Sequence, residues 1–182
     1  MDVQDYDCDF YVGNGHKWLC GPRGTSFLYI NPDSEIELSP NFLAFWNADS
    51  SGIIRDAKIF EYGTRDSMLL FGFQAVMDVY AKWNWQMHGG RIKELSAYLK
   101  ERLTTLPKCT LHTPTDWDNS SGNVSFSMEG HLYNDVTKYL FEGWNMRTRP
   151  VGEIDAVRIS TNYYNTYGEL DRLVEALEKL GK

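Results

Sequence analysis

The chain carries, between Asp9 and Ile30, the stretch DFYVGNGHKWLCGPRGTSFLYI. The residues from Asp9 to Val12 predict a short buried strand, and the apolar run from Phe27 to Ile30 predicts a second one. Between the two lie a Gly/Asn turn, a His-Lys pair and a Gly-Pro turn. We therefore expect a strand–loop–strand unit that presents a basic pair on a glycine-rich loop.

Lys17 is the residue of this loop with the most reactive side chain. Most lysines are solvated surface charges, and that interpretation stays open for Lys17. A lysine trapped between two strands loses hydration, which makes its neutral amine available to attack an aldehyde. A glycine-rich loop with a neighbouring histidine also favours anion binding. The pattern therefore indicates covalent chemistry with an aldehyde-bearing cofactor.

The residues from Asp9 to Tyr29 resemble the pyridoxal-phosphate attachment segment of the class V aminotransferases of fold type I. The resemblance is closest to the isopenicillin N epimerase-like branch. Two further segments agree in order and spacing, Glu61–Asp66 (EYGTRD) and Val157–Thr166 (VRISTNYYNT), so the resemblance covers essentially the whole chain. It implies pyridoxal 5'-phosphate (PLP) as cofactor, Lys17 as the lysine that forms the internal aldimine, and an enzyme that acts on the α-carbon of an amino acid.

The resemblance also implies which residues hold the cofactor phosphate. His16 and Asn14 correspond to phosphate-binding positions, although a histidine beside a buried strand is more often a satisfied structural residue. Gly63 and Thr64 correspond to a pair that reaches the phosphate held by the other subunit, which implies a homodimer with a shared active site. They follow a strand-like segment, Ile59–Tyr62, and the alternative is that Thr64 or Asp66 simply caps the next helix.

Arg158 lies in the middle of an apolar strand, where a guanidinium is costly without an anionic partner. One interpretation is a core ion pair with Asp or Glu. The resemblance implies instead that Arg158 binds the α-carboxylate of the amino-acid substrate, which suits its bidentate geometry. Arg147 and Arg149 alternate on the preceding predicted strand and so share one face. They either extend the anion pocket towards a substrate side chain or are solvated.

A cysteine desulfurase needs a nucleophilic thiol on a loop of the C-terminal domain. The corresponding segment, Asn145–Pro150, contains no cysteine, and Cys109 lies before the first strand of that domain. Desulfurase activity is therefore a minor alternative, and PLP-dependent C-S lyase activity of a full-length parent stays open. Transamination, epimerisation and elimination share the lysine motif and stay open.

Members of the family run to roughly twice the 182 residues of this chain, so Met1 looks like a truncation point and the chain like the C-terminal half. The expected fold class is α/β, with residues 1–82 as a partial large domain and residues 83–182 as a complete α+β small domain with its connecting helix. We expect the isolated chain to be inactive. The alternative is a non-catalytic fragment with a stable C-terminal domain.

Hydrophobic periodicity predicts the elements of the second part. A helix with one buried stripe should begin at Ser67, and Gly89-Gly90 should interrupt the pattern before a second helix. The order then favours helices on one face of a mainly antiparallel sheet. The expected elements are the helices Arg91–Leu106, Tyr133–Trp144 and Tyr167–Leu180, and the strands Thr110–Thr113, Asn123–Met128, Met146–Arg149 and Ala156–Ser160.

The charge and composition of the chain limit the classes of partner that we expect. The formal net charge of −7 argues against a nucleic-acid surface and favours a small-molecule amino-acid substrate. Three cysteines without close spacing suit reduced thiols, and no metal site is implied. There is no secretory signal and no run long enough for a membrane span, so we expect a cytoplasmic protein.

Overall fold

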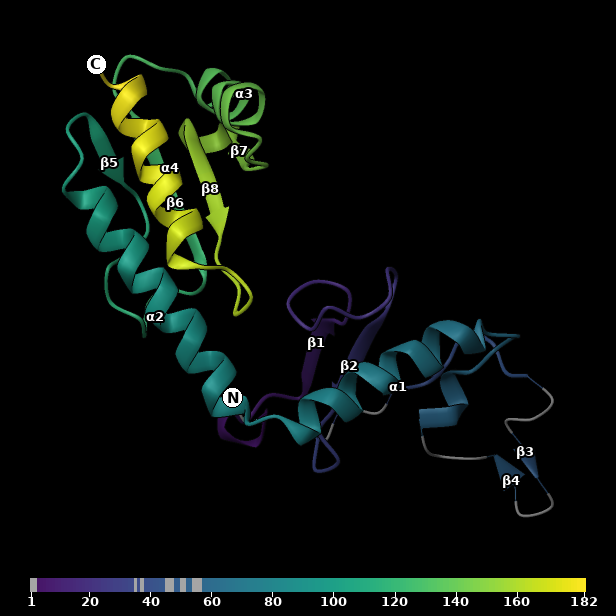
Figure 1. Cartoon of the computed structure of the whole chain (residues 1–182). Helices are drawn as coiled ribbons and strands as arrows, with labels where there is room; N and C mark the ends of the chain where they lie inside the picture. Colours follow the sequence, from purple (N-terminus) through teal and green to yellow (C-terminus); the bar gives the residue numbers. More distant parts are fainter. Residues whose placement is uncertain (1–2, 35, 37, 45–47, 50–51, 54–56) are drawn as a thin grey trace. The chain divides into compact units, whose positions relative to one another are not determined.

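The computed structural model describes residues 3–34, 36, 38–44, 48–49, 52–53 and 57–182 (Figure 1). The chain separates into two compact units, Met1–Lys82 and Trp83–Lys182. Within the described ranges, no helix is both long enough and apolar enough to cross a membrane.

The first unit is built on a β-hairpin and one helix. Strand β1 (Phe10–Asn14) pairs antiparallel with β2 (Ser26–Ile30), and α1 (Ser67–Lys82) packs against the loop that joins them. A Cβ atom added at Gly72 of α1 would lie 2.7 Å from the Pro22 side chain, which shows how closely helix and loop approach. The remaining elements are η1 (Val3–Tyr6), β3 (Ala48–Asp49), β4 (Gly52–Ile53) and η3 (Ala57–Phe60).

Three expectations for this unit need correction. The hairpin exists, but its strands are not buried: Val12 is 70% exposed and Leu28 54%. The helix begins at Ser67 as expected, yet within α1 only Tyr80 is buried. The segment expected as a strand at Ile59–Tyr62 instead overlaps the 3₁₀ helix η3. A two-stranded sheet with one helix has too little surface to bury both faces of every element.

The second unit is a four-stranded antiparallel sheet with helices packed on one face. The strands are β5 (Cys109–Leu111), β6 (Asn123–Met128), β7 (Arg149–Val151) and β8 (Ala156–Ser160), in the order β5-β6-β8-β7. The helices are α2 (Trp85–Thr104), α3 (Tyr133–Trp144) and α4 (Tyr167–Leu180), and η4 (Gly152–Ile154) joins β7 to β8. Figure 1 shows α4 running along the sheet between α2 and β8. The predicted α+β layering is confirmed.

The core of this unit lies between the sheet and the helices, because alternate strand residues meet the helix stripes. Phe126 of β6, Val157 of β8 and Leu177 of α4 are almost completely buried there, with Leu95, Leu99 and Leu103 of α2. The helices α3 and α4 and the strands β6 and β8 have the predicted bounds.

Three elements differ from their expected bounds, and the first is β5, which spans Cys109–Leu111 rather than Thr110–Thr113. Helix α2 begins at Trp85 and runs through Gly89-Gly90, because the break lies earlier, where the Asn84 side chain accepts a hydrogen bond from Gln86 N. Each helical glycine costs about 1 kcal/mol relative to alanine, which the buried leucine stripe of α2 offsets. Strand β7 begins at Arg149 rather than Met146.

Candidate functional site

The loop that carries Lys17 is braced by backbone hydrogen bonds. Gly15 N donates to the Thr25 carbonyl (2.9 Å), and Gly21 N donates to the Gly15 carbonyl (2.8 Å). A Cβ atom at Gly15 would lie 2.6 Å from both Thr25 Oγ1 and the Phe73 ring. Glycine is therefore required there by close packing, and the loop has a defined shape.

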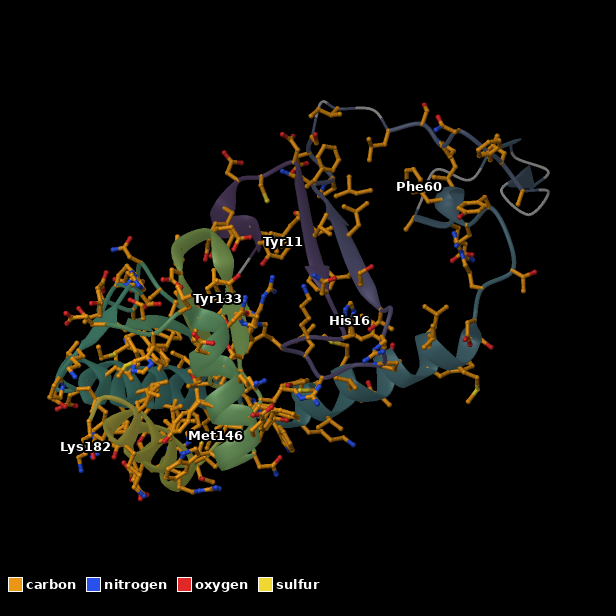
Figure 2. All side chains as sticks on the ribbon, turned by 90° about the horizontal axis from the view of Figure 1, so that it is seen from above. Tyr11, His16, Phe60, Tyr133, Met146 and Lys182 are labelled. Carbon is orange, nitrogen blue, oxygen red and sulfur yellow. The ribbon has the colours of Figure 1, made fainter. Side chains whose placement is uncertain are left out.

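His16 lies in this loop at the end of the hairpin, where Figure 2 labels it. Its Nδ1 atom is 3.0 Å from the Thr25 carbonyl oxygen. Because a carbonyl only accepts, Nδ1 must carry the proton, which fixes the tautomer of the neutral ring and leaves Nε2 for another partner.

Lys17 is exposed at the turn, so the expectation that two strands trap and dehydrate it is wrong for this chain. Among the described residues, the Lys17 amine makes no hydrogen bond or ion pair. Asn14, the last residue of β1, is also exposed. The structure thus brings Asn14, His16 and Lys17 together at one end of the hairpin, with an amide, an imidazole and a free amine available to a ligand.

Gly63 and Thr64 lie just before α1. The cap of this helix is Asp66, whose Oδ1 accepts hydrogen bonds from Met68 N (2.9 Å) and Leu69 N (3.4 Å). Of the two residues expected as alternative caps, Asp66 therefore takes the role. Thr64 is exposed, and a Cβ atom at Gly63 would meet nothing within 4 Å, so the backbone there is open to a ligand.

A pocket of about 480 Å³ lies in the second unit, between the segment after α3, the end of β8 and the start of α4. Its lining includes four arginines and one glutamate, Arg147, Arg149, Arg158, Arg172 and Glu169. Met146, labelled in Figure 2 near α3, also lines it. Strong positive charge is thus concentrated in one pocket of a chain whose net charge is −7.

Arg158 is held by its strand on the sheet face away from the core. Its neighbours Val157 and Ile159 pack into the core, so alternation places Arg158 on the opposite face. There its Cα is paired with Ser125 of β6 and with Arg149 of β7. Its Nε is buried and has no hydrogen-bond partner in the described part of the chain. The salt bridges between described residues all lie elsewhere, so the core ion pair considered from the sequence is not formed.

Glu169, the acidic residue of this pocket, is already engaged. Its carboxylate accepts from Thr166 N (2.8 Å) and Asn165 Nδ2 (3.3 Å), and it completes a capping box at the start of α4. The Thr166 N–H, followed by the Asn165 amide, holds the pKa of Glu169 below its usual value. The sequence analysis missed this residue, although the Thr166-x-x-Glu169 spacing is a known signature of a helix start.

The cysteines of the chain lie outside the segment that corresponds to the desulfurase loop. The described segment at 145–149 lines the pocket and contains no thiol. Cys109 is half-buried in β5, and burial raises the pKa of its thiol to about 11. A thiol in that environment is a weak nucleophile at neutral pH.

Comparison with known proteins agrees with the resemblance noted in the sequence. The family model "Aminotransferase class-V" matches residues 1–173. Isopenicillin N epimerase of Streptomyces clavuligerus is 30% identical, over 99% of this chain and 49% of its own length. Cysteine desulfurase of Salmonella agona is also 30% identical, over 99% of this chain and 47% of its own length. The chain therefore spans about half the length of the curated relatives it matches.

Solved structures confirm the predicted fold. A mutant of C-DES with glycine covalently linked to its PLP cofactor superposes with a TM-score of 0.85 at 23% identity, covering 98% of this chain and 48% of that one. The apo cysteine desulfurase of Thermococcus onnurineus superposes equally well, with a TM-score of 0.85 at 22% identity, over 98% of this chain and 48% of its own. Because the family model matches nearly the whole sequence, the chain belongs to the class V aminotransferase family.

Proposed function

We propose that this chain supplies the lysine, the phosphate contacts and the carboxylate-binding arginine of a PLP-dependent enzyme that acts on the α-carbon of an amino acid. The observation that carries the proposal is the braced loop with a free Lys17 amine beside His16. This donor set fits PLP, because a primary amine suits its aldehyde and an imidazole and an amide suit its phosphate. Membership of the family supports the same cofactor.

Each residue then has a definite task. Bound PLP supplies an electron sink for the bonds of the substrate α-carbon. Lys17 would hold the cofactor through its amine and would move a proton at the substrate α-carbon. His16 and Asn14 hold the phosphate, and Arg158 binds the substrate α-carboxylate with its two-pronged guanidinium.

We also propose a homodimer in which Gly63 and Thr64 of one subunit contact the phosphate held by the other. The open backbone at Gly63 and the exposed Thr64 hydroxyl support this role, since Asp66 alone caps α1. Light scattering of the purified chain with and without PLP tests the proposal. A monomer under both conditions would refute a shared site in this chain.

The proposed cofactor lysine is tested by trapping. The purified chain is mixed with PLP and reduced with borohydride, and the pyridoxyl-labelled peptide is mapped by mass spectrometry. We expect near-stoichiometric labelling of Lys17, its loss in Lys17→Ala, and unchanged labelling in Lys82→Ala, which removes a lysine from the end of α1. Labelling scattered over many lysines would contradict the proposal.

The second candidate is a non-catalytic fragment whose stable part is the α+β unit. The exposure of Lys17 favours this candidate, because the chain itself does not dehydrate the amine. The trapping experiment separates the two: a fragment without an assembled site gives no selective labelling. Desulfurase chemistry remains the weaker alternative, since the pocket segment lacks a thiol.

A further inference from the structure

The arginine pocket of the second unit holds more positive charge than one carboxylate requires. Two of its four guanidinium groups have protein partners: Arg172 donates to the Trp144 carbonyl (3.3 Å), and Arg147 lies 5.5 Å above the Phe141 ring. Among the described residues, Arg149 and Arg158 form no ion pair with an acidic side chain. Two cations of this pocket are thus uncompensated by the protein.

These two cations lie directly opposite each other. Arg149 of β7 is the Cα partner of Arg158 of β8, so both side chains leave the same face of the sheet from adjacent strands. Like charges at directly opposed positions destabilise a sheet. Such an arrangement is stable when an anion lies between the two groups, because each guanidinium then gains a charge-assisted hydrogen bond.

The acidic residues that the structure describes around this pocket do not supply that anion. Glu169 is engaged in the capping box, and Asp155, which follows η4, accepts from Tyr133 N at 3.0 Å. The pocket also contains a buried donor: Thr148 Oγ1 has no hydrogen-bond partner in the described part of the chain, like Arg158 Nε. Unpaired buried donors beside unpaired cations indicate a site for a polar, anionic ligand.

We infer that the pocket selects an amino acid with a second carboxylate at the end of its side chain, with Arg158 on the α-carboxylate and Arg149 on the side-chain carboxylate. The inference rests on the proposed function and names its substrate class, the acidic amino acids. Neighbouring strands are about 4.8 Å apart, a spacing that a short dicarboxylic chain bridges. Arg149 is exposed, so its guanidinium reaches a side chain that enters from solvent.

The test titrates the full chain, without cofactor, with L-glutamate, its neutral isostere L-glutamine, and L-alanine. NMR signals of the arginine Nε–H groups report the affinity. We expect L-glutamate to bind about tenfold more tightly than L-glutamine, which corresponds to roughly 1.4 kcal/mol. In Arg149→Gln this ratio should fall to about one while L-alanine binds as before. In Arg158→Gln all three ligands should weaken.

Lys138→Gln is the matched control, because it removes one positive charge from an exposed position of α3 outside the pocket. It should leave the ratio unchanged. Equal affinity for L-glutamate and L-glutamine, or a preference that survives Arg149→Gln, would overturn the inference. If L-alanine still bound and Arg158→Gln weakened that binding, the proposed role of Arg158 would be supported even though the inference about Arg149 had failed. No binding of any ligand overturns the inference for this chain, whereas the Lys17 trapping experiment judges the cofactor site independently.

Discussion

Replacing Arg158 by methionine should make the second unit more stable while removing its affinity for amino-acid carboxylates. The Nε of Arg158 is buried without a partner, and a second arginine faces it across the strand pair. An unsatisfied buried polar group costs about 1–3 kcal/mol, and a charged one more. Methionine keeps an apolar stem of similar reach and removes both the unpaired donor and the repulsion from Arg149.

We therefore expect the free energy of unfolding of the second unit to rise by about 1–2 kcal/mol in Arg158→Met. For a unit of about 100 residues, each 1 kcal/mol raises Tm by roughly 4–8 °C. Amide hydrogen exchange of Phe126 and Val157 is the appropriate measurement, because core amides report the opening of the whole unit. Lys138→Met, at an exposed position, should change the exchange free energy by no more than about 0.5 kcal/mol.

The opposite result would refute this reasoning. If Arg158→Met lowered the free energy of unfolding by more than about 1 kcal/mol, Arg158 would belong to a stabilising ion pair, as the core interpretation of the sequence proposed. Arg158 would then already have an anionic partner within the protein, and the argument that it binds a substrate carboxylate would fail. Unchanged affinity for L-alanine in the same variant would count against that place directly.

Three further outcomes are expected. Gly15→Ala should destabilise the first unit by about 1–3 kcal/mol through overpacking, and it should reduce labelling of the loop by PLP. An unchanged Tm in a thermal scan, together with normal labelling, would contradict this prediction. Glu169→Ala should lower Tm at pH 7 but hardly at pH 3. The pKa of Glu169 is lowered in the folded state, so its carboxylate stabilises the fold at pH values above the unfolded-state pKa of about 4.3. This stabilisation is lost as the pH falls through the folded-state pKa. An equal loss at both pH values would show that charge is not involved. At pH 8, Cys109, with its thiol pKa raised to about 11, should react with a thiol reagent much more slowly than the exposed Cys20, and equal rates would exclude burial as the controlling factor.

The periodic elements of this protein could be predicted from the sequence because they depend on local spacing. The bounds of α3, α4, β6 and β8 follow from apolar repeats of 3.6 and 2 residues, which nearly determine how a segment buries one face. The same holds for the order of the motifs around Lys17 and Arg158, which carried the family resemblance. Chemistry encoded in short, contiguous segments is visible before any fold is known.

Tertiary structure decided the environments of those residues. The exposure of Lys17 depends on how the two-stranded hairpin and one helix pack together. The spacing of residues in the sequence does not determine that packing. The start of α2 at Trp85 rather than after Gly89-Gly90 depends on a leucine stripe that packs on a distant sheet. The pairing of Arg149 with Arg158 depends on the strand register, because a shift of one residue would send the two guanidinium groups to opposite faces.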